Sequence, residues 1–247
     1  MTLVRWAYGV TCVPQRFDTL LPRTLASLAR AGFDSPHLFV DHSWEHEVPE
    51  VYRKAYHVTC RWPDSQGVGV RAQGNWTLGL WELYIRNHHC DLFAMFQDDL
   101  VACRGLKEYL TQVPYPEKGY LNLYTFPSNQ QICPRDPATG RQREGWYHSN
   151  QCGRGAVALV FDKPTVEMIL SCQHIVHRIQ DVHWGHRKLD GGLIEGARKA
   201  GWREWVHNPS LVQHTGQKAT AIGNVEQPLA PSFRGEDWDA CSLLWGK

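Results

Sequence analysis

The segment spanning residues 92–99 joins five consecutive apolar residues to the tripeptide Gln97-Asp98-Asp99. An apolar run of this length, bounded by Asp91 and Gln97, suits a buried strand and is too short for a helix. Two adjacent carboxylates repel each other, so they need a cation or several hydrogen-bond donors to stay ionised together. The segment therefore predicts a buried strand that places charge at a site beyond its end; the alternative is that Asp98 or Asp99 caps a following turn.

The acid pair, meaning Asp98 and Asp99, also favours a particular type of metal ion. Carboxylate oxygens are hard ligands that favour Mg²⁺ or Mn²⁺, and these ions in turn bind substrate phosphates. Mn²⁺ or Mg²⁺ is therefore the expected cofactor.

Length and charge narrow the class of protein only a little. The 247 residues suit one domain, residues 1–247, with a substantial core. Twenty-six basic and 25 acidic side chains give a formal net charge of +1, which neither requires nor excludes a polyanionic partner. No segment approaches the roughly 18 apolar residues of a membrane span, and the N-terminus lacks a signal core, so a soluble, cytoplasmic protein is expected.

Eight cysteines could pair into disulfides in a secreted protein, but none forms a C-x-x-C pair. Cys12, Cys90 and Cys172 lie in or beside apolar segments. Buried free thiols are therefore the favoured interpretation.

Apolar strand patterns alternate with amphipathic helix patterns along the chain, which predicts an α/β fold with a mainly parallel central sheet flanked by helices. Strands are expected over residues 3–11, 36–41, 56–62, 91–99, 119–126 and 155–161. The first helix is expected to be capped by Asp18 and to bury Leu21, Leu25 and Leu28; the next is expected to bury Leu78, Trp81 and Ile85; later helices are expected over 105–113, over 163–172 and after Asp190.

Two segments between these elements bear on function. Residues 67–74 contain three glycines but do not match G-x-G-x-x-G, so a dinucleotide-binding site is poorly supported. Residues 128–154 form a long polar stretch, which is either a surface excursion or an active-site loop.

Four motifs, taken together, resemble the GT-A-fold nucleotide-sugar-dependent glycosyltransferases over roughly residues 3–220. The motifs are an opening strand that ends in Val10-Thr-Cys-Val-Pro-Gln-Arg16, a strand that ends in Val40-Asp41, the acid strand Gln97-Asp-Asp99, and the closing Pro209-Ser-Leu-Val-Gln-His-Thr-Gly216. The resemblance divides the domain into a nucleotide-sugar-binding half (1–126), an acceptor and catalytic half (127–224) and a C-terminal tail (225–247), which is expected to wrap the body.

In that family the acid pair forms the DXD-type motif. The resemblance implies that Asp99 binds the metal on the donor diphosphate, that Asp98 holds the donor ribose or sugar, and that His214 completes the metal shell. Taken alone, His214 is more typical of a hydrogen-bonded loop histidine. Gln97 departs from the family's acid at this position and adds no charge, which weakens the expected metal affinity.

The resemblance also assigns donor contacts near two other strand ends. Thr11, Pro14, Arg16 and Asp41 match positions that cradle the nucleotide base and ribose. Arg71, Gln73 and Asn75 match positions that touch the donor sugar and phosphate, although Asn75 is also a good helix N-cap.

Asp190 matches the carboxylate base of inverting members of the family, and in a retaining enzyme it would orient the acceptor. An Asp before Gly191 and an apolar-periodic helix is equally a good N-cap, and the two roles are compatible because a helix N-terminus stabilises an anion.

The acceptor is left open by the sequence. Trp146, Tyr147, His148 and Arg154 could line an acceptor platform or simply pack a loop. Arg135, Arg141 and Arg143 lie in the same polar stretch, which keeps a phosphate-bearing acceptor such as DNA open beside a glycan or small molecule.

The first functional interpretation is a hexosyl transfer from a nucleotide diphosphate sugar, UDP-linked by expectation, to an acceptor hydroxyl. A metal-dependent nucleotidyl or phosphoryl transferase is a different class that also uses acids at strand ends, and the absence of a Gly-x-x-x-x-Gly-Lys loop disfavours it. A non-catalytic nucleotide-sugar binder is the third class.

Overall fold

A computed structural model of the chain describes residues 3–176, 189–216 and 228–245. They form one α/β body around an eight-stranded sheet with the order β3-β2-β1-β4-β8-β6-β9-β7. The pairs β1–β2, β2–β3, β1–β4 and β6–β9 are parallel, and the other three pairs are antiparallel. This architecture confirms the predicted fold class. The strands are β1 (Trp6–Cys12), β2 (His37–Asp41), β3 (Val58–Arg61), β4 (Leu92–Gln97), β6 (Gly119–Asn122), β7 (Gly145–His148), β8 (Ala158–Asp162) and β9 (Arg203–Asn208), with β5 (Leu100–Ala102) and β10 (Val212–His214) in a separate two-stranded sheet.

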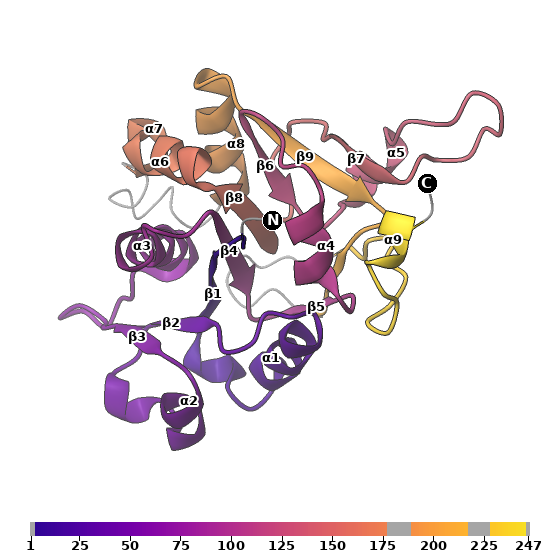
Figure 1. Cartoon of the computed structure of the whole chain (residues 1–247). Helices are drawn as coiled ribbons and strands as arrows, with labels where there is room; N and C mark the ends of the chain where they lie inside the picture. The colour runs from indigo at the N-terminus through magenta and orange to yellow at the C-terminus, as the bar shows by residue number, and fades with distance from the viewer. Residues whose placement is uncertain (1–2, 177–188, 217–227, 246–247) are drawn as a thin grey trace.

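Helices cover both faces of the large sheet (Figure 1). The packing of buried side chains puts α1, α2 and α4 on one face and α3, α6 and α8 on the other. The helices and 3₁₀ turns are η1 (Pro14–Arg16), α1 (Leu20–Arg30), η2 (Glu45–Glu47), α2 (Glu50–Ala55), α3 (Arg71–Arg86), α4 (Leu106–Gln112), α5 (Pro127–Gln131), α6 (Lys163–Ser171), α7 (Gln173–Val176), α8 (Leu189–Lys199) and α9 (Ser242–Trp245).

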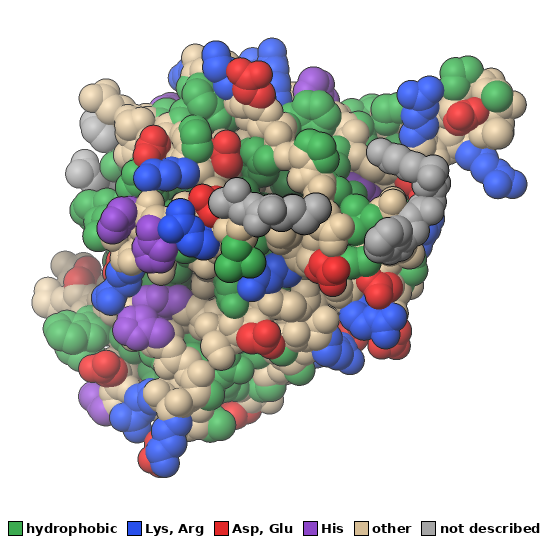
Figure 2. Space-filling model, in the orientation of Figure 1, with side chains coloured by type: hydrophobic (Ala, Val, Ile, Leu, Met, Phe, Trp, Pro, Cys, Tyr) green, Lys and Arg blue, Asp and Glu red, His purple; other side chains and the backbone are tan. Residues whose placement is uncertain are grey.

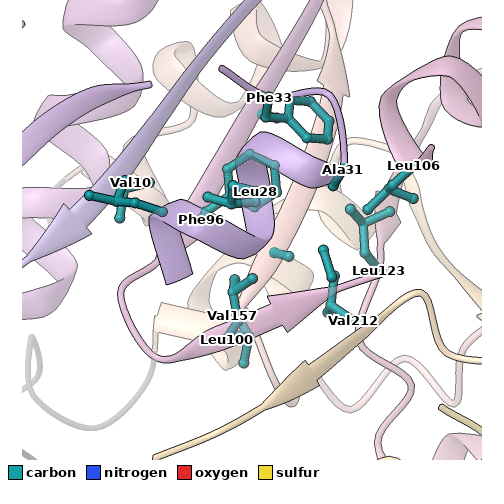
Figure 3. Close-up of a cluster of buried hydrophobic side chains, with 14 of the residues drawn as sticks. Val10, Leu28, Ala31, Phe33, Phe96, Leu100, Leu106, Leu123, Val157 and Val212 are labelled. Carbon is teal, nitrogen blue, oxygen red and sulfur yellow. The ribbon is translucent and has the colours of Figure 1, made fainter. Parts of the chain in front are cut away.

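The larger core cluster lies between the sheet and α1. Val10 of β1, Leu28 of α1 and Phe96 of β4 pack there with Leu100 of β5 and Val212 of β10 (Figure 3). All five side chains are fully buried. The cluster therefore anchors the two-stranded β5–β10 sheet to the end of the acid strand, which positions the site described below.

Helix α3 buries a different face from the predicted one. It begins at Arg71 and buries Trp76, Leu80 and Leu83, whereas Trp81 and Ile85 of the predicted face are exposed. Gly79 explains part of the difference, because a Cβ there would come within 2.9 Å of the Phe39 ring. The helix contacts the sheet closely through a glycine, which a pattern of large apolar residues does not reveal.

The cap predicted for α1 is also wrong. The helix begins at Leu20, its N-cap position is Thr19, and no side chain caps it. The predicted stripe is confirmed, because Leu21, Leu25 and Leu28 are all buried. The cap failed because Asp18 lies one residue too early to occupy the N-cap position.

Residues 132–144 form a hairpin that projects away from the body between α5 and β7 (Figure 1). Asp136 holds its turn by accepting hydrogen bonds from the backbone amides of Ala138 and Thr139, and Arg135 pairs with Gln142 across the hairpin. Basic and acidic side chains occur together on this projection (Figure 2). The polar stretch is therefore a surface excursion over this part of its length.

The other expectations concern the cysteines, the tail and membrane spans. Each of the eight cysteines is free; Cys12 and Cys90 are buried as predicted, whereas Cys172 is only half-buried. Within residues 228–245 the tail packs on the body: the backbone amide of Arg104 donates to the carbonyl oxygens of Glu236 and Trp238. No helix within the described ranges is long and apolar enough to cross a membrane.

Candidate active site

The acid pair follows β4, at the point where the strand order reverses: β2 and β3 lie on one side of β1, and β4 lies on the other. Strands β1, β2 and β3 extend the sheet in one direction, and β4 pairs with β1 on the opposite side, with Thr11 beside Gln97. In open α/β sheets, ligands bind in the crevice beyond the carboxyl ends of the strands at such a switch point. The loop after β1 and the acid pair after β4 form the two sides of this position.

Arg16 spans the two carboxylates of the acid pair. Its Nη1 donates to Asp98 Oδ1 and, at 2.8 Å, to Asp99 Oδ2. The backbone amide of Val13 donates to Asp98 Oδ2 at 3.3 Å. Both oxygens of Asp98 therefore accept hydrogen bonds from the loop after β1, so Asp98 fixes the conformation of this loop.

His214 reaches Asp99 through the two-stranded sheet. Leu100 of β5 pairs with His214 of β10, and the backbone amide of Thr215 donates to the carbonyl oxygen of Asp99 at 2.7 Å. This pairing leaves His214 Nε2 at 3.2 Å from Asp99 Oδ2. Gly216 permits the close approach, because a Cβ there would lie 2.8 Å from the His214 ring and 3.1 Å from Asp99 Oδ2.

Burial and charge act in opposite directions on the acid pair. Asp98 and Asp99 are 3% and 4% exposed. Burial raises the pKa of Asp98 above its ordinary value, with Arg16 opposing this effect and the neighbouring Asp99 adding to it. For Asp99 burial acts in the same direction, but the hydrogen bonds and charges of His214 and Arg16 outweigh it and lower the pKa. Asp99 is thus the member of the pair that ionises more readily.

Asp99 and His214 carry the types of atom that bind a divalent cation. Within the described part of the chain, Asp99 Oδ1 and His214 Nδ1 are buried atoms with no hydrogen-bond partner. A carboxylate oxygen and an imidazole nitrogen both suit Mn²⁺ or Mg²⁺. The described residues bring no three His, Cys, Asp or Glu side chains into a metal-binding cluster.

Two hydroxyl groups of α1 that the sequence analysis missed fix the backbone around the acid pair. Thr24 Oγ1 lies 2.9 Å from the carbonyl oxygens of Asp98 and Leu100, and Ser27 Oγ accepts a 2.9 Å hydrogen bond from the amide of Ala102. Both side chains are fully buried. They lie among the apolar residues of the α1 stripe, and a polar residue on a buried helix face was the signal that could have identified them.

Asp41, at the end of β2, anchors the loop that leads into α3. Its Oδ1 accepts hydrogen bonds from the amides of His42 at 2.9 Å and Val70 at 3.0 Å. Gly69 lies so close that a Cβ would be 2.8 Å from the same oxygen. Burial raises the pKa of Asp41, and these amides oppose the shift.

The other predicted donor residues lie along the same edge of the sheet. Thr11 Oγ1 donates to the carbonyl oxygen of Phe96 at 3.3 Å, and Pro14 opens the 3₁₀ turn that carries Arg16. Arg71 begins α3 with a φ of 66°, a left-handed conformation that non-glycine residues adopt at a cost. Gln73 is buried in the first turn of the same helix.

Asn75 is not the N-cap of α3. It is an interior residue of the helix, whose N-cap position is Val70, and its Nδ2 donates to the carbonyl oxygen of Phe39 in β2 at 2.8 Å. The helix begins before the position that the N-cap interpretation required. Asn75 therefore ties α3 to the sheet.

Asp190 is the second residue of α8, so it is inside the helix and not at its N-cap. Its Oδ2 accepts a 2.7 Å hydrogen bond from the amide of Gly155, in the segment that leads into β8. Gln97 holds the same segment by donating from Nε2 to the carbonyl oxygen of Ala156 at 2.9 Å. Asp190 and the residue before the acid pair thus bind adjacent residues of one segment.

Glu204 is a buried carboxyl group that the sequence analysis missed. Its Oε1 accepts hydrogen bonds from Asn122 Nδ2 at 3.1 Å and from the Tyr120 hydroxyl at 3.3 Å. Asn122 Nδ2 also donates to the carbonyl oxygen of Arg154 at 3.3 Å, next to the residue that holds Asp190. Burial raises the pKa of Glu204 to about 7.

The predicted acceptor residues are dispersed. Trp146 is half-buried with its ring 4.8 Å from that of His207, and Tyr147 is buried and donates to the carbonyl oxygen of Asn129. His148 packs on Trp205, and Arg154 extends over the Phe126 ring. No hydrogen bond or ion pair among the described residues joins them to the acid pair. Arg135, Arg141 and Arg143 lie on the projecting hairpin.

Comparison with known proteins adds little to this geometry. No model of a known protein family matches the sequence, and no curated protein matches it. Among solved structures, the chain is similar to mannose-1-phosphate geranyltransferase from Thermus thermophilus, with 14% identity over 83% of this chain and 74% of the other, and a TM-score of 0.48. Similarity of this degree does not indicate a shared activity.

Proposed function

We propose that the chain is a metal-dependent glycosyltransferase that moves a sugar from a nucleotide diphosphate sugar, with UDP as the expected nucleotide, to an acceptor hydroxyl. The observation that carries the proposal is the convergence of Arg16, Asp98, Asp99 and His214 at the switch point of the sheet. A cationic guanidinium, a buried carboxylate with an unpartnered oxygen and an imidazole suit a ligand that consists of a cation and a diphosphate.

Asp99 and His214 would hold the divalent ion, which, when bound, neutralises the charge that develops on the leaving diphosphate. Arg16 is placed to bind a phosphate oxygen once the ion shares the charge of the acid pair. Asp41 and the first turn of α3 would position the nucleoside.

In the transfer step, the acceptor oxygen forms a bond to the anomeric carbon of the sugar. The bond between that carbon and the diphosphate oxygen breaks, and the nucleoside diphosphate leaves with the electron pair. If the configuration inverts, the proton of the acceptor hydroxyl passes to the Asp190 carboxylate. If it is retained, Asp190 orients the acceptor instead. The raised pKa of Asp190, caused by burial and opposed by the amides of Ala156 and Gly155, suits a group that accepts a proton.

The test is a donor screen that measures the release of nucleoside diphosphate. Wild-type protein is incubated with UDP- and GDP-linked sugars in Mn²⁺, Mg²⁺ or EDTA, with and without glycan, small-molecule and hydroxylated DNA acceptors. We expect release with one donor, stimulated by metal and lost in Asp99→Asn. The matched control is Asp237→Asn, because Asp237 is an exposed carboxylate in the tail.

Two outcomes would point to the competing classes. Release of pyrophosphate from a nucleoside triphosphate and a sugar phosphate would make the protein a nucleotidyltransferase. Tight binding of a nucleotide sugar with no release under any condition would make it a binding protein.

A further inference from the structure

A surface pocket lies beyond the end of β2, lined by Trp44, Glu45, His46, Arg53 and Trp62. The side chains of Trp44 and Trp62 are 40% and 61% exposed. Most of the large aromatic side chains in the described part of the chain are buried or half-buried, so two exposed indoles that share one pocket are a distinct feature of this surface. Exposed apolar groups that gather at one place mark sites of interaction.

Local hydrogen bonds hold the Trp44 side of the pocket. The amide of Trp44 donates to Glu47 Oε2 at 2.9 Å, and the amide of Glu47 donates back to the carbonyl oxygen of Trp44 at 3.0 Å. The amide of Ser43 donates to the carbonyl oxygen of Arg61, which joins this turn to the end of β3, where Trp62 follows. The two aromatic residues are therefore fixed relative to each other by the backbone.

The two indole rings also support each other. Their centroids are 5.0 Å apart and their planes meet at 28°, which is a stacked arrangement. A stacked pair loses little conformational freedom when a ligand binds, because the rings are already ordered. The pair is thus a preformed aromatic platform.

The polar groups of the pocket determine which ligand suits this platform. Glu45 supplies hydrogen-bond acceptors, Arg53 supplies donors, and the His46 ring can supply either. A ring with hydroxyl groups around its edge needs both kinds of partner, and its C–H face can lie on the electron-rich face of an indole. One carboxylate and one guanidinium give the pocket no excess of positive charge, so it does not select a phosphate.

We propose that this pocket binds a sugar ring of an uncharged glycan, at a position separate from the acid pair. The pocket uses none of the residues assigned to the transfer step, and the inference does not depend on the proposed glycosyltransferase activity. It makes the protein a carbohydrate-binding protein at this surface whether or not the acid pair is catalytic.

The test is binding to an array of neutral and anionic glycans, followed by saturation-transfer difference NMR on the neutral glycans that bind. We expect Trp44→Ala and Trp62→Ala each to weaken binding by about tenfold or more, as is typical for the loss of an aromatic anchor. Trp81→Ala is the matched control, because Trp81 is another exposed tryptophan, 52% exposed, that lies outside the pocket on α3. Arg53→Ala provides a second variant that keeps both indoles.

Saturating UDP with Mn²⁺ separates this site from a nucleotide site. We expect glycan binding to persist in its presence. Displacement of the glycan by UDP, binding confined to anionic glycans, or absence of binding to the array would each overturn the proposal. Thermal unfolding of each variant verifies that loss of binding reflects the pocket and not the fold.

Discussion

Two regions of the molecule hold carboxyl groups away from solvent and compensate them in different ways. The acid pair is matched by the guanidinium of Arg16 and by His214. Asp190 and Glu204 are instead held by neutral donors, which include the amide of Gly155 and the side chain of Asn122. The contacts with Arg16 and His214 lower the pKa of Asp99, whereas burial raises the pKa values of Asp190 and Glu204 despite their neutral donors.

This difference separates two kinds of chemistry. An ionised carboxylate next to cations suits ligands that carry charge, such as a metal ion and a diphosphate. A carboxyl group with a raised pKa holds a proton more readily and suits general acid–base work. The comparison predicts that substitutions in the first region act through charge and that substitutions in the second act through protons.

The largest effect is expected from Asp99→Asn. Removing the ionised oxygen should reduce turnover by about a thousandfold, since a catalytic metal contributes several kcal/mol. His214→Ala should cost less, because an imidazole that holds a metal ion is neutral, so its loss leaves the charge of the metal-bound site unchanged. Steady-state rates at saturating donor and Mn²⁺ measure both. Full activity of either variant after exhaustive chelation would contradict the metal assignment.

Arg16→Gln tests whether charge compensates the acid pair. The variant leaves two buried carboxylates without their guanidinium, which should lower the free energy of unfolding by about 3 kcal/mol. Mn²⁺ should then stabilise the variant more than the wild type, because it replaces the lost cation. Urea unfolding with and without Mn²⁺ measures this. The control is Arg23→Gln, because the Arg23 side chain is 60% exposed. Equal free energies of unfolding for Arg16→Gln and wild type would contradict the conclusion that Arg16 compensates the charge of the acid pair.

Asp190→Asn tests the second region by removing the proton acceptor while keeping a group of the same shape. We expect about a hundredfold slower transfer with unchanged donor affinity, because the amide cannot take a proton. Single-turnover rates and calorimetric donor binding separate the two quantities. A matched loss of donor affinity would instead assign Asp190 to the donor site.

Glu204→Gln should give the smallest effect, visible as a change in the pH dependence of stability. The pKa of Glu204 is raised from 4.5 to about 7 in the folded state. As the pH rises from 4.5 to about 7, Glu204 ionises in the unfolded chain but stays protonated in the folded protein, so the free energy of unfolding of the wild type falls. The variant lacks this loss and should gain about 2 kcal/mol relative to wild type between roughly pH 5 and pH 8. Urea unfolding at both pH values measures this gain.

Glu117→Gln, at an exposed position, is the matched control for Glu204→Gln. A pH-independent difference between Glu204→Gln and wild type would show that Glu204 is held by its hydrogen bonds alone.

The sequence predicted the parts of the site that depend on a single segment. The apolar run before Asp98 predicted both a buried strand and acids at its end, because strand burial and chain direction are local properties. The contact of Asp99 with His214 came only from a family resemblance, since it depends on pairing between β5 and β10. The salt bridges of Arg16 could not be predicted, because the position of a long side chain depends on neighbours distant in sequence.

The errors also have physical reasons. Glu204 was missed because a Glu between Arg203 and Trp205 looks like a solvent-facing strand residue, whereas its side chain is buried and bonded by Tyr120 and Asn122 of β6. The face of α3 was misassigned because its closest contact is made by Gly79, which carries no hydrophobic signal. Both errors lie where contacts with segments distant in sequence decided the burial.

The residues that contact the acid pair are far apart in sequence, so they are synthesised at different times. Arg16 and Asp98 are 82 residues apart, and both precede the N-terminal end of α4. A nascent chain can therefore pair β1 with β4 and neutralise its acids internally during synthesis. His214 joins only after the strands on the far side of the sheet have been made, because β10 follows all of them. The candidate site is thus completed by a late segment of the chain, whereas the residues of the Arg16–Asp98 ion pair are synthesised much earlier.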